Sequence, residues 1–386
     1  MTCHYPDSDM SLLAMEMFTR LNPDDEIVFF HDKTIEFHEF STTFRLKCIQ
    51  ECILLDSSCQ FIRHINKRIC TIYSAIEKTF FKGENNIYLR EKKLPRVHFL
   101  NGSFLEQNQL KIISLDVNLN LKYNYISLIT PFAFEILEKI EILELSFNSL
   151  SKICSKSFYG MANLKILLLN SNQIKQFEPD AFQGIPKLRS LNLNRNSISH
   201  LDKNLFDDLK ELVSIDLNSN QIELLERPLF KNLQNLKTIY LGYNKLKSLE
   251  PVFDNLVSLD LLDVSNNQII TIHNDTFKSL KTIRILSIDS NQISEISSET
   301  FKGAANLDLL KLGLNKLQRV HKNFSLNFQN LTHLDMSYNN LYFIEADFFN
   351  GLTKLKYLEF NGLTKLKSFR ISLSNHNIIK CNVKLL

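Results

Sequence analysis

One pattern recurs ten times in this chain of 386 residues: Leu-x-Leu-x-x-Asn-x-Leu, followed by a Phe about ten residues after the Asn. Successive asparagines are 24 residues apart, except for an interval of 23 between Asn244 and Asn267. The asparagines are Asn124, Asn148, Asn172, Asn196, Asn220, Asn244, Asn267, Asn291, Asn315 and Asn339. A fixed period of this length predicts a stack of similar coils in which each coil packs against its neighbours.

A single repeat explains why these residue types recur. Leu167 and Leu169 alternate along a short strand and point into the core. Asn172 follows where the chain turns, and its amide is able to bond backbone groups of neighbouring coils. Ile174 and Phe182 fill the rest of the coil. The pattern therefore predicts a core of leucine and phenylalanine with a ladder of asparagines beside it.

The motif resembles the typical extracellular subfamily of leucine-rich repeat proteins, over about two-thirds of the chain. The resemblance implies an α/β solenoid shaped like a horseshoe, with a parallel sheet on its concave side. Residues 119–374 are assigned to the repeats. Residues 94–118 are interpreted as a degenerate capping repeat, because terminal repeats are atypical.

A cysteine-rich segment precedes the repeats, and residues 1–25 before it remain unassigned. The arrangement C-x3-C-x6-C-x-F, then C-x-I-Y-S, resembles a PAN/apple module over residues 26–93, a small disulfide-stapled α+β domain with a closing strand at Asn86 to Arg90. In the family the pairs would be Cys48–Cys70 and Cys52–Cys59. The sequence alone permits three connectivities, and zinc ligation by the four thiolates is the alternative.

The outward residues of the repeat strands form lanes across the sheet. Carboxylates outnumber bases there, although the chain has a net charge of +3. Asp263 and Asp289 are expected on neighbouring strands with tyrosines beside them, which suits a protein or peptide ligand with a basic surface. The predicted ligand-binding residues are Glu144, Asp216, Tyr240, Tyr243, Asp263, Asp289, Asp335 and Tyr338. The alternative is a polar sheet surface without a specific site.

The C-terminal end departs from the period. Asn350 to Lys356 reappears as Asn361 to Lys367, eleven residues later, and the simplest register makes Phe369 and Ile371 the next strand. Residues 375–386 resemble the opening of a cysteine-flanked cap, of which Cys381 is one member, and are interpreted as a truncated cap.

Several features indicate an extracellular or cell-surface location. Sequons for N-glycosylation begin at Asn101, Asn274, Asn323 and Asn330. No apolar run is long enough to span a membrane. The N-terminus has no convincing signal peptide, which conflicts with an extracellular location, so we expect a chain that has lost its leader. Cys154 is interpreted as a small residue tolerated in its coil, with Cys3 as one candidate disulfide partner.

No catalytic, metal-binding or cofactor-binding motif is present in the sequence, and the small net charge gives no reason to expect a nucleic-acid partner. The leading hypothesis is a non-catalytic extracellular recognition module, as in receptor ectodomains and adhesion proteins. A structural matrix protein without a dedicated ligand and a cytosolic repeat scaffold are the alternatives.

Overall fold

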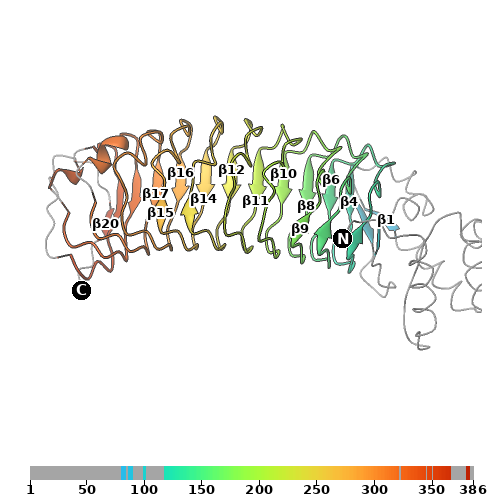
Figure 1. The fold of residues 1–386 in the computed structure, drawn as a ribbon, viewed down its shortest axis with the longest axis horizontal. Helices are drawn as coiled ribbons and strands as arrows, with labels where there is room; N and C mark the ends of the chain where they lie inside the picture. Colours follow the sequence, from blue (N-terminus) through green and yellow to red (C-terminus); the bar gives the residue numbers. More distant parts are fainter. Residues whose placement is uncertain are drawn as a thin grey trace, which may run out of the picture. The chain divides into compact units, whose positions relative to one another are not determined.

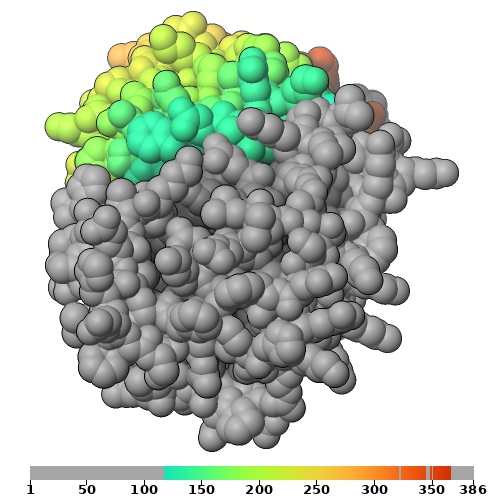
Figure 2. Space-filling view, turned by 90° about the vertical axis from the view of Figure 1, so that its right-hand side faces the viewer, coloured from blue at the N-terminus to red at the C-terminus, as the bar shows by residue number. Residues whose placement is uncertain are grey.

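The structure is a computed structural model of the chain. It describes residues 80–83, 86–89, 99–100, 117–320, 323–344, 346–349, 351–366 and 380–382 (Figures 1 and 2). The residues divide into two compact units: Met1–Leu168 with Glu178–Ile185, and Leu169–Phe177 with Pro186–Leu386. Figure 2 shows side chains of the first described repeats in teal, from residue 117 onward.

The main sheet of the first unit runs in the order β1-β2-β4-β6-β8. β1 and β2 pair antiparallel, whereas β2, β4, β6 and β8 are successive parallel neighbours. β3 pairs with β5 in a separate short ladder. The strands are β1 (Phe80–Gly83), β2 (Asn86–Leu89), β3 (Phe99–Leu100), β4 (Asn118–Asn120), β5 (Leu128–Ile129), β6 (Ile142–Glu144), β7 (Lys152–Ile153) and β8 (Ile166–Leu168).

The main sheet of the second unit is parallel, in the order β10-β11-β12-β14-β16-β17-β18-β19-β20. β13 pairs with β15 in a separate two-stranded parallel sheet. The strands are β9 (Gln176–Phe177), β10 (Ser190–Asn192), β11 (Ser214–Asp216), β12 (Thr238–Tyr240), β13 (Ser248–Leu249), β14 (Leu261–Asp263), β15 (Thr271–Ile272), β16 (Ile285–Ser287), β17 (Leu309–Lys311), β18 (His333–Asp335), β19 (Tyr357–Glu359) and β20 (Lys380–Asn382).

The predicted asparagine ladder is confirmed. Asn244 is representative: its Oδ1 accepts the backbone N–H of Ile222 at 3.0 Å, and its Nδ2 donates to the carbonyls of Leu217 and Leu241, each at 3.0 Å. Asn148 makes the equivalent bonds in the first unit. Each of these side chains ties its own coil to the preceding one and satisfies backbone groups that are closed off from water.

The residue before each ladder asparagine adopts a left-handed backbone conformation. All ten have φ between 52° and 60°, and none of them is glycine. Its N–H donates to the next coil, as when Tyr243 donates to the Ser265 carbonyl at 3.0 Å. Such a conformation is uncommon for residues with a side chain, and it turns these side chains outward at the end of the strand, so that Tyr243 is 63% exposed.

Phenylalanines form the predicted core beside the leucines. In the first unit the rings of Phe134, Phe158 and Phe182 stack with centroids 6.2 and 6.1 Å apart. The described residues contain no α-helix; the coils return through turns and two 3-10 helices, η2 (Phe324–Asn327) and η3 (Ala346–Phe349). The α/β class implied by the resemblance is therefore corrected to a β-solenoid, because short turns complete each 24-residue coil. None of the described helices is long and apolar enough to cross a lipid bilayer.

The register predicted for the C-terminal end was wrong. The strand beside β19 is β20, with Leu358 opposite Cys381, and not a strand at Phe369 and Ile371. The physical reason is the length of the coil: 23 residues separate Leu358 from Cys381, which matches the interval of the other repeats, whereas Ile371 would leave about half a coil. Residues 367–379 lie outside the described residues.

At the N-terminal end, the predicted closing strand of the PAN/apple module is a strand. It belongs to the repeat sheet, since Ile87 of β2 lies opposite Leu119 of β4. The module's four cysteines, Cys3 and Asn101 lie outside the described residues. Cys154 is fully buried and disulfide-bonded, in agreement with the disulfide considered for it from the sequence.

Candidate functional site

Most of the predicted ligand-binding residues lie together on the sheet of the second unit. The strand register aligns Asp216 with Tyr240, Tyr240 with Asp263, and Asp263 with Ser287. The same lane continues through Lys311 to Asp335 and Glu359. Neighbouring strands lie about 4.8 Å apart, so Asp216 and Asp263 stand on either side of Tyr240. We call this lane with its flanking residues Asp289, Tyr243 and Tyr338 the sheet face.

The carboxylates of the sheet face also hold their own strand ends. The Oδ1 atoms of Asp216, Asp263 and Asp335 each accept the backbone N–H two residues later, at 2.9, 2.9 and 2.8 Å. Glu144 accepts the N–H of Ser146 in the same way at 3.0 Å. Because Oδ1 is committed in each, Asp263 and Asp335 offer mainly Oδ2 to a ligand, whereas Oδ2 of Asp216 also accepts a hydrogen bond from Asn194 at 3.3 Å.

Burial perturbs two of these carboxyl groups. Partial burial raises the pKa of Asp216, and the nearby charge of Asp263 adds to the rise, against the lowering effect of hydrogen bonds from Asn218 and Asn194. Partial burial also raises the pKa of Asp289; Lys311 opposes the rise, and the charges of Asp263 and Asp335 add to it. Asp263 lies on β14, and Asp289 follows β16, the parallel neighbour of β14. A cation placed among these groups would relieve their mutual repulsion.

Exposed side chains and two glycines shape the surface beside the carboxylates. Tyr243 and Tyr338 are 63% and 57% exposed. Gly242 and Gly313 occupy equivalent positions, and a Cβ at Gly313 would lie 2.9 Å from Oδ2 of Asp335. Both glycines are buried, and the space that a Cβ would take is filled by the Asp335 carboxylate at Gly313 and by the Asn218 amide at Gly242.

Charged side chains that directly precede the sheet strands form ion pairs between successive coils. Arg284 donates two hydrogen bonds to Asp260, which lowers the pKa of that carboxyl. Lys165 pairs with Glu141 at 2.6 Å in the first unit. The lane from Asp216 to Glu359 contains four carboxylates, and Lys311 is its one cation among the described residues.

Glu144 belongs to the first unit. Its register neighbours are Asn120 and Leu168, neither of which is charged. Nearby, Tyr123 and Phe147 stack at 4.7 Å, and the Lys122 ammonium lies 5.1 Å from the centre of each ring. Tyr123 and Phe147 were not among the predicted ligand-binding residues, although each directly precedes a ladder asparagine, as Tyr243 does.

The sequons differ in exposure. Asn274 and Asn323 are exposed, whereas Asn330 is half-buried and bonded to Asn306 and Lys354. No group of three or more His, Cys, Asp or Glu side chains suited to a metal ion occurs in the part of the chain that the structure describes.

Comparison with known proteins gives a consistent result. The family described as "Leucine rich repeat" matches seven overlapping segments that together span residues 117–363. No curated protein sequence matches the chain.

Solved structures with the same fold include the TLR13–ssRNA13 complex, with a TM-score of 0.62 and 26% identity over 70% of this chain and 39% of that one. The Drosophila Toll–Spatzle complex has a TM-score of 0.55 and 24% identity, over 66% and 37%. The repeat domain of APL1B has a TM-score of 0.58 and 21% identity, over 71% and 76%. The chain thus spans less than half of the length of the TLR13 and Toll chains.

Proposed function

Because this chain belongs to the leucine-rich repeat family, we propose that it is a non-catalytic protein-recognition module that binds a ligand with a basic surface on the sheet face. The observation that carries the proposal is the register of Asp216, Tyr240 and Asp263 on three successive strands. Carboxylates that bracket tyrosines provide steering charge together with aromatic contact area, a combination suited to protein ligands.

The proposed location is extracellular or at the cell surface. The disulfide at Cys154 supports it, since disulfides persist mainly in oxidising compartments. The exposure of Asn274 and Asn323 agrees with glycosylation at these two sequons. The Toll–Spatzle complex is a precedent for a protein ligand on a chain of this fold.

A nucleic-acid ligand is the second candidate, raised by the single-stranded RNA in the TLR13 complex. Nucleic-acid binding draws on lysine and arginine side chains that neutralise phosphates. The sheet face instead presents carboxylates at Asp216, Asp263, Asp289 and Asp335, with Lys311 among them. This arrangement favours a cationic protein over a polyanion.

The test measures binding of the full chain to a panel of purified secreted proteins on a biosensor. The variant D216N/D263N/D289N removes three charges from the sheet face, and E138Q/D208N/E295Q removes three exposed charges elsewhere. We expect ligands of the wild-type chain to bind the first variant at least tenfold more weakly and the control unchanged, with an association rate that falls as salt rises. Ligands that bind all three proteins equally would remove the sheet face from consideration.

A further inference from the structure

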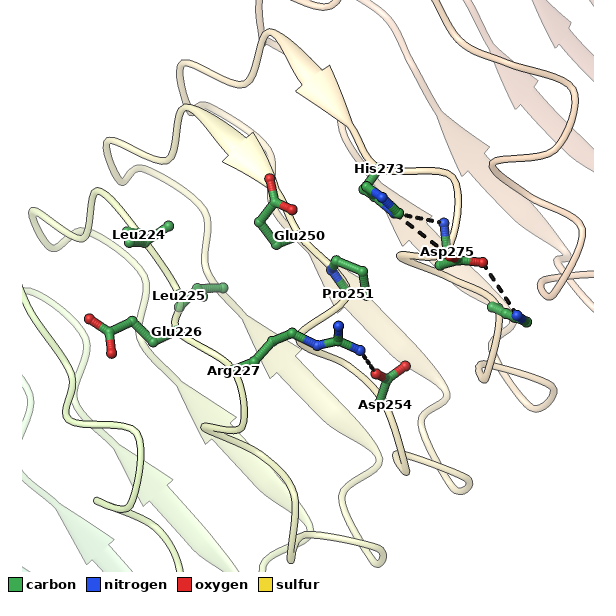
Figure 3. Close-up of a pocket in the computed structure, with 10 residues that line it drawn as sticks. Leu224, Leu225, Glu226, Arg227, Glu250, Pro251, Asp254, His273 and Asp275 are labelled. Atoms are coloured by element: carbon green, nitrogen blue, oxygen red, sulfur yellow. Dashed lines mark hydrogen bonds and ion pairs between the residues drawn. The ribbon is translucent and has the colours of Figure 1, made fainter.

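An open surface cavity of about 610 Å³ lies in the second unit beside the ladder of β13 and β15 (Figure 3). Residues of three successive coils line it, at Leu224 to Arg227, at Glu250 to Asp254 and at His273 to Lys278. A cavity of this volume is in the range of ligand-binding pockets and exceeds the size of one side chain.

The cavity coincides with the one-residue-shorter repeat. Phe230 follows Asn220 by ten residues, whereas Phe253 follows Asn244 by nine. Leu225 and Leu249 hold equivalent buried positions five residues after their asparagines, so the missing residue falls between Leu249 and Phe253. The shortened turn, Glu250 to Val252, forms one wall of the cavity.

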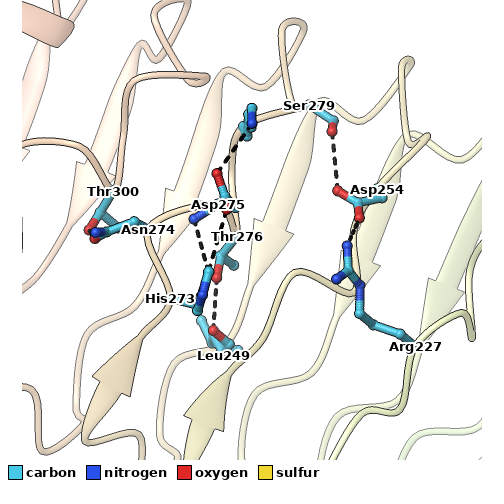
Figure 4. Close-up of polar contacts among 10 residues, drawn as sticks. Arg227, Leu249, Asp254, His273, Asn274, Asp275, Thr276, Ser279 and Thr300 are labelled. Atoms are coloured by element: carbon cyan, nitrogen blue, oxygen red, sulfur yellow. Dashed lines mark hydrogen bonds and ion pairs between the residues drawn. The ribbon is translucent and has the colours of Figure 1, made fainter.

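The two cationic side chains that line the cavity are already paired. Arg227 forms an ion pair with Asp254, which also accepts a hydrogen bond from Ser279 at 3.3 Å (Figure 4). Lys278 pairs with Asp275 at 3.5 Å. In Figure 3 the Arg227 side chain extends toward Asp254, on the side opposite to Glu226.

Two carboxylates of the lining remain uncompensated. The lining contains four acidic side chains and two basic ones, and Asp254 and Asp275 take both bases. Within the described residues, neither Glu226 nor Glu250 has an ion pair or side-chain hydrogen bond. The β13–β15 register places Glu250 next to His273, whose Nδ1 accepts the N–H of Asp275 at 3.1 Å.

Apolar surface lies beside these carboxylates. Leu224 is 50% exposed, and Leu225 and Pro251 are buried next to it. Long cationic side chains bury their aliphatic stems on apolar surface while the charged end reaches a carboxylate. We propose that this cavity binds a short segment of a partner protein through an arginine or lysine that lies on Leu224 and reaches the exposed carboxylates of Glu226 and Glu250.

The site is separate from the sheet face and does not depend on the function proposed for it. The test uses the full chain and a fluorescent capped pentapeptide with one arginine between two leucines, followed by fluorescence anisotropy. The same peptide with citrulline keeps the shape and removes the charge. We expect binding of the arginine peptide alone, at least tenfold weaker binding to E226Q/E250Q, and unchanged binding to E138Q/E295Q and to D216N/D263N/D289N.

Three results would overturn the inference: equal binding of the citrulline peptide, a change below twofold in E226Q/E250Q, or loss of binding in the sheet-face variant. A second measurement does not depend on the folding of any variant. Carbodiimide labelling of the wild-type carboxylates, read by mass spectrometry, is expected to show protection of Glu226 and Glu250 by the arginine peptide. Labelling of both residues that stays unchanged at saturating peptide contradicts the site.

Discussion

Replacement of one ladder asparagine tests how the coils are joined. In Asn244→Ala, the buried N–H of Ile222 loses its acceptor, and the carbonyls of Leu217, Leu241 and Gly242 lose their shared donor. Each carbonyl keeps a second donor, from Asn220, Asn267 and Ser219 in turn, so the unsatisfied N–H carries the cost. A buried donor left unsatisfied costs about 1–3 kcal/mol, and we expect the free energy of unfolding to fall by that amount.

The assay is urea unfolding followed by circular dichroism. The matched control is Asn235→Ala, since the Asn235 amide also donates to a backbone carbonyl, that of Lys210, but does so at the exposed surface. Water replaces that bond, so we expect a loss below about 1 kcal/mol in the control. Equal losses in the two variants would refute the view that buried backbone satisfaction at Asn244 joins the coils.

A third variant, Asn244→Asp, separates the donor from the acceptor. The carboxylate still accepts the N–H of Ile222 but faces the carbonyls of Leu217 and Leu241, which raises its folded pKa above the unfolded value. The resulting cost is absent below the unfolded pKa, about 3.9, and grows as pH rises through it. We expect Asn244→Asp to be less stable than Asn244→Ala at pH 7 and to regain stability near pH 3.

Three further changes have defined outcomes. The folded pKa of Asp289 is raised, so its charge opposes folding at neutral pH. Asp289→Asn should therefore raise the urea midpoint at pH 7. The gain should vanish near pH 3, where the carboxyl is protonated in both the folded and the unfolded state. A Cβ at Gly303 would lie 2.1 Å from a backbone carbonyl oxygen, whereas one at Gly242 has nothing nearer than 3.1 Å; Gly303→Ala should cost about 2–3 kcal/mol in urea unfolding and Gly242→Ala clearly less. The buried Thr276 hydroxyl donates to a backbone carbonyl of the preceding coil at 2.8 Å, so Thr276→Val should lose about 1–2 kcal/mol when deglycosylated proteins are compared.

The sequence period was sufficient to predict the core and the lanes of the sheet face. A coil of fixed length repeats the same inward and outward positions, so Asp216 and Asp263 are predictable neighbours of Tyr240 once the asparagines are aligned. The backbone bonds made by these carboxylates were not predicted. The carboxylate of an acidic residue at the end of a strand can accept the backbone N–H of the residue two positions later. The acidic residues at these strand ends were visible in the sequence.

Two other features escaped prediction because they depend on the coil as a whole. At the C-terminal end, apolar alternation at Phe369 and Ile371 favoured a local strand, but the length of a complete coil places β20 at Lys380–Asn382. The cavity beside Glu250 follows from the interval of 23 residues between Asn244 and Asn267. That interval was visible, yet which turn it shortens becomes clear only when the buried positions are aligned.

The most direct test of the central claim is a footprint of the sheet face with a bound protein ligand from the secreted-protein panel. Carbodiimide labels the free carboxylate oxygens of Asp263 and Asp335, hydroxyl radicals oxidise Tyr243 and Tyr338, and mass spectrometry reads both. The account predicts that ligand binding protects these residues and leaves Glu138 and Glu295 labelled as before. A saturating ligand that leaves Asp263 and Tyr243 fully reactive would contradict it.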